Sequence, residues 1–86
     1  MPFTYILYST KLNKYYVGAC IELGRRLYEH NIGHSRFTSL GIPWEIVYSE
    51  NHPTLLDAKK REREIKKMKS RKFIENLIKG RPSGPE

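Results

Sequence analysis

Two runs of β-forming residues, separated by a turn and followed by a helix, fill the first third of the chain and constrain its fold. Residues 3–9 and 15–20 are rich in aromatic and β-branched side chains, and residues 10–14 between them are turn material. This pattern predicts a β-hairpin. If an odd residue of the first strand lies opposite an even residue of the second, Tyr5 and Tyr16 share one face of the hairpin.

A helix is expected directly after the hairpin, over residues 22–30. Steps of 100° per residue place two leucines on its inward side, with Arg26 and His30 beside that apolar edge. Arg25 points away from the sheet and is expected to be solvated. An arginine pair on an amphipathic helix is also typical of plain surface charge, so that alternative stays open for Arg26.

The next segment, residues 31–43, contains two glycines and a proline and is expected to be a loop over one end of the sheet. It carries His34, Ser35, Arg36 and Phe37. Basic groups interleaved with an aromatic ring suit contact with a phosphate backbone and a stacked base. The alternative is an ordinary polar loop with Phe37 tucked into the core.

A third strand is expected at residues 44–48. Its alternation predicts one face formed by Trp44, Ile46 and Tyr48, and the other by Val47.

Two helices should complete the chain. Thr54 is a credible N-cap, with Asp57 at the capping-box position, for a helix that runs to about residue 68; the last helix covers residues 70–79. The order β-β-α-β-α-α predicts an α+β fold with a three-stranded, mainly antiparallel sheet flanked by helices.

One carboxylate lies where an apolar side chain is expected. Helical projection places Glu62 within the apolar stripe of the first long helix, which consists of Leu55, Ala58, Ile65 and Met68. A buried acid needs a cationic partner, and either Arg26 or a divalent metal would serve. The lysines around it, Lys60 and Lys66 among them, are a solvated face or a phosphate-binding one.

Composition limits the chain to one small domain, residues 1–80, with a disordered tail at 81–86. The 86 residues carry 16 Lys and Arg against 9 Asp and Glu, a formal charge of +7, which favours an anionic partner such as nucleic acid. The single cysteine cannot form an internal disulfide, and no apolar run reaches transmembrane length. We therefore expect a cytoplasmic protein that does not insert into membranes.

These residues resemble the motifs of the GIY-YIG nuclease superfamily. Tyr5-Ile6-Leu7 is similar to its first tyrosine motif and Tyr16-Val17-Gly18 to its second, while Arg26 and His30 follow at the spacing of its helical Arg and His/Tyr positions. Glu62 matches the metal-site glutamate of the family. The resemblance covers roughly residues 3–78, as in small single-domain bacterial members, and implies the GIY-YIG fold.

The sequence departs from the family pattern in three places. The first motif lacks its glycine, which leaves Tyr8 as an alternative to Tyr5 for the first tyrosine. Ala19 stands where some repair-type members have a lysine. Asn76 could fill the position of an asparagine that is functional in several members.

The resemblance implies metal-dependent hydrolysis of a phosphodiester. Glu62 would hold one Mg²⁺ or Mn²⁺ in a largely hydrated shell. Tyr16 would be the general base, Arg26 would hold the non-bridging oxygens, and His30 and Tyr5 would complete the cluster. The products implied are a 5′ phosphate and a 3′ hydroxyl. DNA, single-stranded or structured, is favoured over RNA as the partner.

Two rival hypotheses remain at this stage. A nucleic-acid-binding module could keep the fold and its basic face without cutting, and a protein-interaction domain could carry the charge incidentally. On the residues alone, the tyrosines also fit simple strand aromatics.

Overall fold

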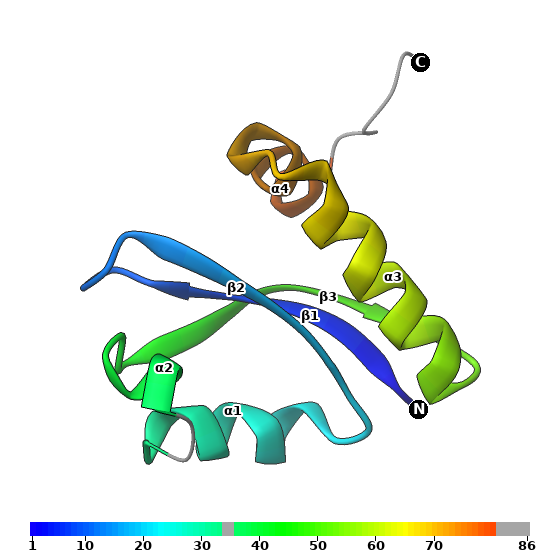
Figure 1. Ribbon diagram of the computed structural model, residues 1–86. Helices are drawn as coiled ribbons and strands as arrows, with labels where there is room; N and C mark the ends of the chain where they lie inside the picture. The colour runs from blue at the N-terminus through cyan, green and yellow to red at the C-terminus, as the bar shows by residue number, and fades with distance from the viewer. Residues whose placement is uncertain (34–35, 81–86) are drawn as a thin grey trace.

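The computed structural model describes residues 1–33 and 36–80, which form a sheet with helices on both of its faces (Figure 1). In chain order the elements are β1 (Phe3–Ser9), β2 (Lys14–Cys20), α1 (Leu23–Asn31), α2 (Arg36–Ser39), β3 (Trp44–Asn51), α3 (Leu55–Met68) and α4 (Arg71–Ile78). The predicted α+β fold and order of elements are confirmed. The short helix α2 is an addition within the segment expected to be a loop. The tail expected at 81–86 lies outside the described residues.

The sheet is antiparallel and has the strand order β2-β1-β3, so β2 is an edge strand. Tyr5 of β1 pairs with Gly18 of β2, and Leu7 pairs with Tyr16. Residues paired across antiparallel strands point to the same face. Tyr5 and Tyr16 therefore lie on one face, as the parity of the hairpin predicted.

Strand β3 does not keep the simple alternation expected of it. Ile6 pairs with Tyr48, but the next residue, Leu7, pairs with Ile46, so Val47 is an extra residue in β3. A bulge of this kind shifts the pattern by one position. Ile46 therefore packs with Tyr5 and Leu7, while Tyr48 joins Val47 on the other face. The predicted common face for Trp44, Ile46 and Tyr48 was wrong for Tyr48.

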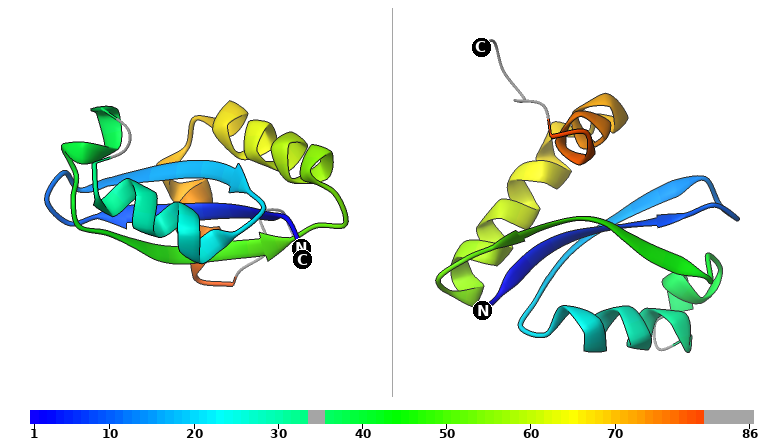
Figure 2. Two further views of the ribbon diagram at one scale, coloured as in Figure 1. Left: turned by 90° about the horizontal axis from the view of Figure 1, so that it is seen from below. Right: turned by 180° about the vertical axis from the view of Figure 1, so that it is seen from behind.

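Each face of the sheet buries its own hydrophobic cluster. Tyr5, Leu7, Cys20 and Trp44 form the cluster on the α1 side, and Ile6, Val17, Ile65 and Leu77 form the cluster on the side of α3 and α4. Figure 2 shows the two layers of helices on opposite sides of the sheet. The tyrosine face is thus the one that α1 and α2 cover.

Local sequence determines where the last two helices begin. The Thr54 hydroxyl accepts a hydrogen bond of 3.1 Å from the Asp57 amide, and the Ser70 hydroxyl accepts one of 3.0 Å from the Phe73 amide. Each satisfies an amide that the first turn of a helix leaves without a partner. Met68, expected in the apolar stripe of α3, is the last residue of that helix and is exposed.

Candidate active site

Tyr5 is the buried centre of the candidate site. Its hydroxyl lies 3.1 Å from Nε2 of His30, which α1 supplies and which is also buried. The Tyr5 ring lies directly over Gly18, where an added Cβ would be 2.5 Å from the hydroxyl oxygen. Glycine at position 18 is therefore required by the close approach of the ring. Tyr8, the alternative first tyrosine, lies on the opposite face and hydrogen-bonds to Asn13.

Burial and nearby charges both change the pKa of the Tyr5 hydroxyl. Burial raises the pKa of the Tyr5 hydroxyl well above its usual range. Tyr16 and Glu62 raise the pKa further through their negative forms, while Arg26 lowers it. Tyr5 is therefore a neutral phenol at physiological pH. The charges that act on Tyr5 thus come from side chains of β2, α1 and α3.

Tyr16 stands at the edge of the sheet among other rings. Its ring centroid is 5.0 Å from that of His30 in an edge-on arrangement, 6.2 Å from that of Trp44 and 6.0 Å from that of Phe37. The Lys66 ammonium lies 6.0 Å from the Tyr16 centroid. The ring is only partly buried, so its orientation is fixed while solvent and ligands can still approach it.

The two adjacent arginines of α1 differ in exposure. The Arg26 side chain is 44% exposed and the Arg25 side chain 74%, which agrees with the prediction that Arg25 is the solvated one. Both pair with Glu29, Arg25 at 3.3 Å and Arg26 at a longer 3.7 Å. A loose, partly exposed ion pair contributes little stability, so Arg26 can exchange its partner for an incoming anion.

Glu62 is largely withdrawn from solvent but is not paired as expected. Its side chain is 22% exposed, whereas that of Glu64 on the same helix is 66% exposed. The sequence suggested either Arg26 or a divalent metal as its partner. Instead, Glu62 pairs with Lys66, one helical turn away, at 2.5 Å. A glutamate and a lysine at i and i+4 face each other on a helix, so the local pairing prevails over the distant one.

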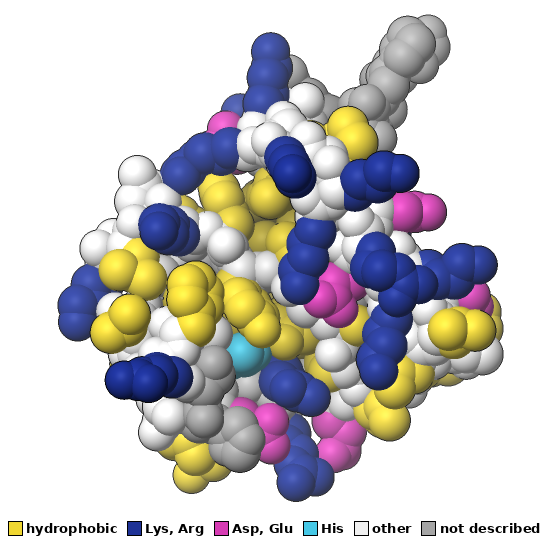
Figure 3. Space-filling view, in the orientation of Figure 1, with side chains coloured by type: hydrophobic (Ala, Val, Ile, Leu, Met, Phe, Trp, Pro, Cys, Tyr) yellow, Lys and Arg dark blue, Asp and Glu magenta, His cyan; other side chains and the backbone are white. Residues whose placement is uncertain are grey.

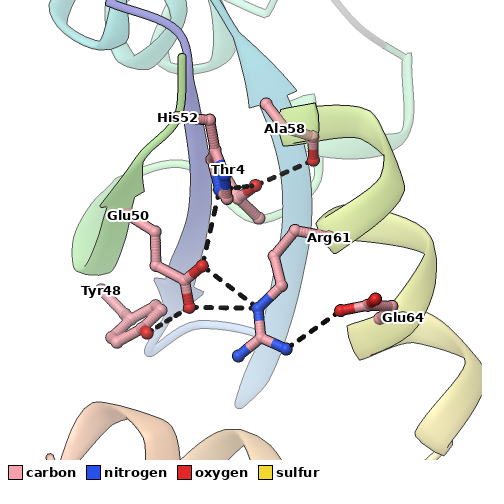
Figure 4. Close-up of polar contacts among 7 residues, drawn as sticks. All are labelled: Thr4, Tyr48, Glu50, His52, Ala58, Arg61 and Glu64. Atoms are coloured by element: carbon pink, nitrogen blue, oxygen red, sulfur yellow. Dashed lines mark hydrogen bonds and ion pairs between the residues drawn. The ribbon is translucent and has the colours of Figure 1, made fainter. Parts of the chain in front are cut away.

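A polar network on the other face fixes α3, and with it Glu62, against the sheet (Figure 4). Arg61 Nε donates to both carboxylate oxygens of Glu50 on β3, at 3.1 Å each. The Thr4 hydroxyl of β1 donates to the Ala58 carbonyl of α3 at 2.8 Å. That bond uses the only hydroxyl proton, so His52 Nε2 donates to Thr4 at 2.9 Å. Sequence patterns gave no signal for this network.

A cleft of about 450 Å³ opens beside this cluster, between α1 and α3 at the end of β2. Its lining includes Ala19, Cys20, Arg25, Arg26, Glu29 and Lys59. Figure 3 shows Lys and Arg side chains gathered over α3 and acidic side chains between α3 and α1 on the same side of the molecule. Arg26 is thus shared between the cleft and the surroundings of Tyr5.

The remaining predicted contact residues fall into three groups. His34 and Ser35 lie outside the described residues. Arg36 and Lys60 are exposed on α2 and α3 and so are open to a ligand. Asn76 is on α4, which packs against the sheet face opposite Tyr5, so the fold does not bring Asn76 to the tyrosines.

The donor set suits one hydrated hard cation rather than a cage of protein ligands. Among residues 1–33 and 36–80, no group of three or more His, Cys, Asp or Glu side chains could enclose a metal. Mg²⁺ commonly binds through one or two carboxylates and retains several waters. Glu62 fits that pattern, since its counter-ion is a partly exposed lysine that a metal can displace.

Comparison with known protein families gives a match over most of the chain. The family model of the GIY-YIG catalytic domain matches residues 1–76. The chain belongs to the GIY-YIG family. Searches of curated proteins and of solved structures each gave no significant match.

The GIY-YIG assignment confirms the resemblance read from the motifs and supports a nuclease-type function, with nucleic acid as the substrate class. The match extends across the hairpin, α1, β3, α3 and most of α4, so it includes every element that contributes to the tyrosine cluster. In the described part of the chain, no helix is both long and apolar enough to cross a bilayer.

Proposed function

We propose that this GIY-YIG protein hydrolyses phosphodiester bonds of nucleic acid, DNA rather than RNA, with one bound Mg²⁺ or Mn²⁺. The observation that carries the proposal is the cluster in which the Tyr5 hydroxyl lies 3.1 Å from His30 Nε2 and the His30 ring lies 5.0 Å from that of Tyr16, with the charges of Arg26 and Glu62 near enough to affect the pKa of Tyr5. Phenol, guanidinium and a single carboxylate are the groups that this reaction needs within one site.

Burial separates the roles of the two tyrosines. The raised pKa of Tyr5 keeps its hydroxyl protonated, which suits a hydrogen bond that holds His30 in place. Tyr16 is more accessible and has the Lys66 ammonium beside its ring. Because a water and a phosphate can reach the Tyr16 hydroxyl but not the buried one of Tyr5, we assign Tyr16 as the general base that takes a proton from the attacking water.

The phosphate and its counter-charges occupy the space between α1 and α3. Arg26 leaves its weak pairing with Glu29 and donates to the non-bridging oxygens, where negative charge builds in the transition state. Glu62 would hold the divalent ion in place of its present partner Lys66. The ion, when bound, supplies Lewis-acid stabilisation of the phosphate and of the leaving 3′ oxygen. Lys66 is then available to the nucleic-acid backbone.

The test is a cleavage assay with single-stranded, duplex and branched DNA and with RNA, each with Mg²⁺, Mn²⁺ or EDTA. Glu62→Gln removes the metal-binding charge and keeps the size of the side chain. We expect its cleavage rate to fall by about 100-fold or more, the scale seen when one preorganised electrostatic group is lost. Binding of nucleic acid, measured by fluorescence anisotropy, should be largely retained.

Glu64→Gln is the matched control, since it makes the same change on the exposed side of the same helix. Its cleavage rate should match that of the parent protein. Equal losses in both variants would show that Glu62 has no special role. Binding to every substrate without metal-dependent cleavage of any would favour the non-catalytic binding module instead.

A further inference from the structure

A large aromatic side chain stands exposed next to the proposed general base. Phe37 on α2 is 51% exposed, and its ring centroid lies 6.0 Å from that of Tyr16 at an interplanar angle of 34°. Single exposed apolar residues are common on protein surfaces and need no explanation by themselves. This one differs because it lies beside the ring on which the chemistry is proposed to depend.

Buried contacts hold Phe37 in this exposed position. The next residue, Thr38, is fully buried, and its carbonyl accepts a 2.6 Å hydrogen bond from the indole Nε1 of Trp44. The Asn31 side chain makes two hydrogen bonds to the Trp44 backbone. It accepts one from the amide at 2.7 Å and donates one to the carbonyl at 3.1 Å. The short helix α2 is thereby tied to α1 and β3. Phe37 therefore presents its ring outward from a rigid support.

Cations lie along the path that leads to this ring. Lys66 of α3 lies by Tyr16, near the start of β2, and Lys59 of α3 lines the cleft by Cys20, at the end of β2. Helix α3 therefore runs antiparallel to β2. Arg26 lies in the same cleft. A nucleic-acid strand that follows these charges passes Arg26 and reaches Lys66 and the Tyr16 ring, which also lies beside Phe37. Such a combination of a basic track and an aromatic face is typical of proteins that bind single strands.

We propose that Phe37 stacks on one unpaired base next to the scissile phosphate, so that the protein selects single-stranded or frayed nucleic acid. The inference rests on the proposed function for the position of that phosphate. In a duplex, both faces of each base are already covered by its neighbours, so a base can offer its face to Phe37 only when it is unstacked. The Phe37 ring, whose centroid lies 6.0 Å from that of Tyr16, also helps to orient Tyr16.

Stacking can be tested without cleavage, in EDTA and with the Glu62→Gln protein. The probe is a single-stranded DNA 12-mer that carries one 2-aminopurine, placed in turn at each position. We expect one position whose fluorescence changes on binding, and the change to disappear in Phe37→Ala but not in Phe37→Trp. Affinity for the single strand should fall about tenfold in Phe37→Ala, the scale of losing one base stack, with duplex affinity little changed.

Leu40→Ala is the matched control, because Leu40 is an exposed apolar residue of the same segment. Circular dichroism confirms that each variant is folded. The inference is overturned if Phe37→Ala and Leu40→Ala behave alike, if duplex and single-strand affinities fall together, or if no position reports stacking. If stacking depends on Phe37 but the parent protein cleaves nothing, the subsite stands and the hydrolase proposal fails. If the protein cleaves nucleic acid but neither stacking nor binding depends on Phe37, the hydrolase proposal stands and the stacking subsite fails.

Discussion

Replacing Gly18 with alanine should displace the Tyr5 ring. The new Cβ would lie 2.5 Å from the Tyr5 hydroxyl oxygen and 2.6 Å from the ring carbon that bears it, distances that real Cβ atoms essentially never show. Tyr5 cannot swing aside at little cost, because it is buried in the α1-side cluster and its hydroxyl is hydrogen-bonded to His30. The ring must therefore shift or the two strands must separate.

The expected loss of stability has two parts. Overpacking a well-packed site costs about 1–3 kcal/mol. Breaking the hydrogen bond between Tyr5 and His30 adds about 1 kcal/mol. For a domain of this size, each kcal/mol corresponds to roughly 4–8 °C in Tm, so Gly18→Ala should lower Tm by about 10 °C or more. Cleavage should fall with it, since His30 would lose its support.

Thermal and urea unfolding, followed by circular dichroism, measure the effect. Gly24→Ala is the matched control: Gly24 is in helix α1, and beyond its chain neighbours and the backbone of its own helix no atom lies within 4 Å of the Cβ that alanine would add. Alanine in an exposed helix stabilises by about 1 kcal/mol relative to glycine, so the two variants should change stability in opposite directions. A free energy of unfolding of Gly18→Ala within about 0.5 kcal/mol of that of the parent protein would refute the argument from the close approach of the Tyr5 ring. Tyr5→Phe, which removes the nearest oxygen, should recover part of the loss when added to Gly18→Ala.

Three further predictions concern the base, a helix cap and alkaline stability. Tyr16→Phe should reduce the cleavage rate by about 10²–10⁴-fold in single-turnover assays, while Tyr8→Phe, on the opposite face, should leave it unchanged. Thr54→Ala removes the acceptor for the Asp57 amide and should lower the free energy of unfolding by about 1 kcal/mol in urea titrations. Burial, followed by the hydrogen bond and the negative charge of Glu50, raises the pKa of Tyr48 to about 12 from its ordinary value of 10.0. The unfolded tyrosine ionises first, so stability should fall as pH rises from about 10 to about 12, and urea titrations across that range should show a smaller fall in Tyr48→Phe.

The hairpin and the helix starts were predictable because their signals are local. Tyr5 and Tyr16 were expected on one face from strand parity alone, and the register confirms it. Thr54 was expected to cap α3 because a hydroxyl before a helix accepts from an amide three residues on. In both cases, residues close in sequence set the geometry.

The partner of Glu62 and the second face of β3 were not predictable in the same way. Projection on a helical wheel correctly indicated that Glu62 is withdrawn from solvent, but the partners expected for it, Arg26 or a divalent metal, did not include Lys66 on the same helix. The bulge at Val47 likewise moved Tyr48 to the other face, because an extra residue in one strand is visible only once the partner strand is in place.

The sequence by itself determined the order of elements, the Thr54 cap and the presence of tyrosine, arginine, histidine and glutamate at family spacing. Only the tertiary structure decided that Phe37 is exposed beside Tyr16 rather than buried in the core, and that Thr4 of β1 donates to Ala58 of α3 and accepts from His52. The physical reason is that periodicity and capping act over a few residues, whereas burial and partner choice depend on which distant surfaces the packed sheet brings together.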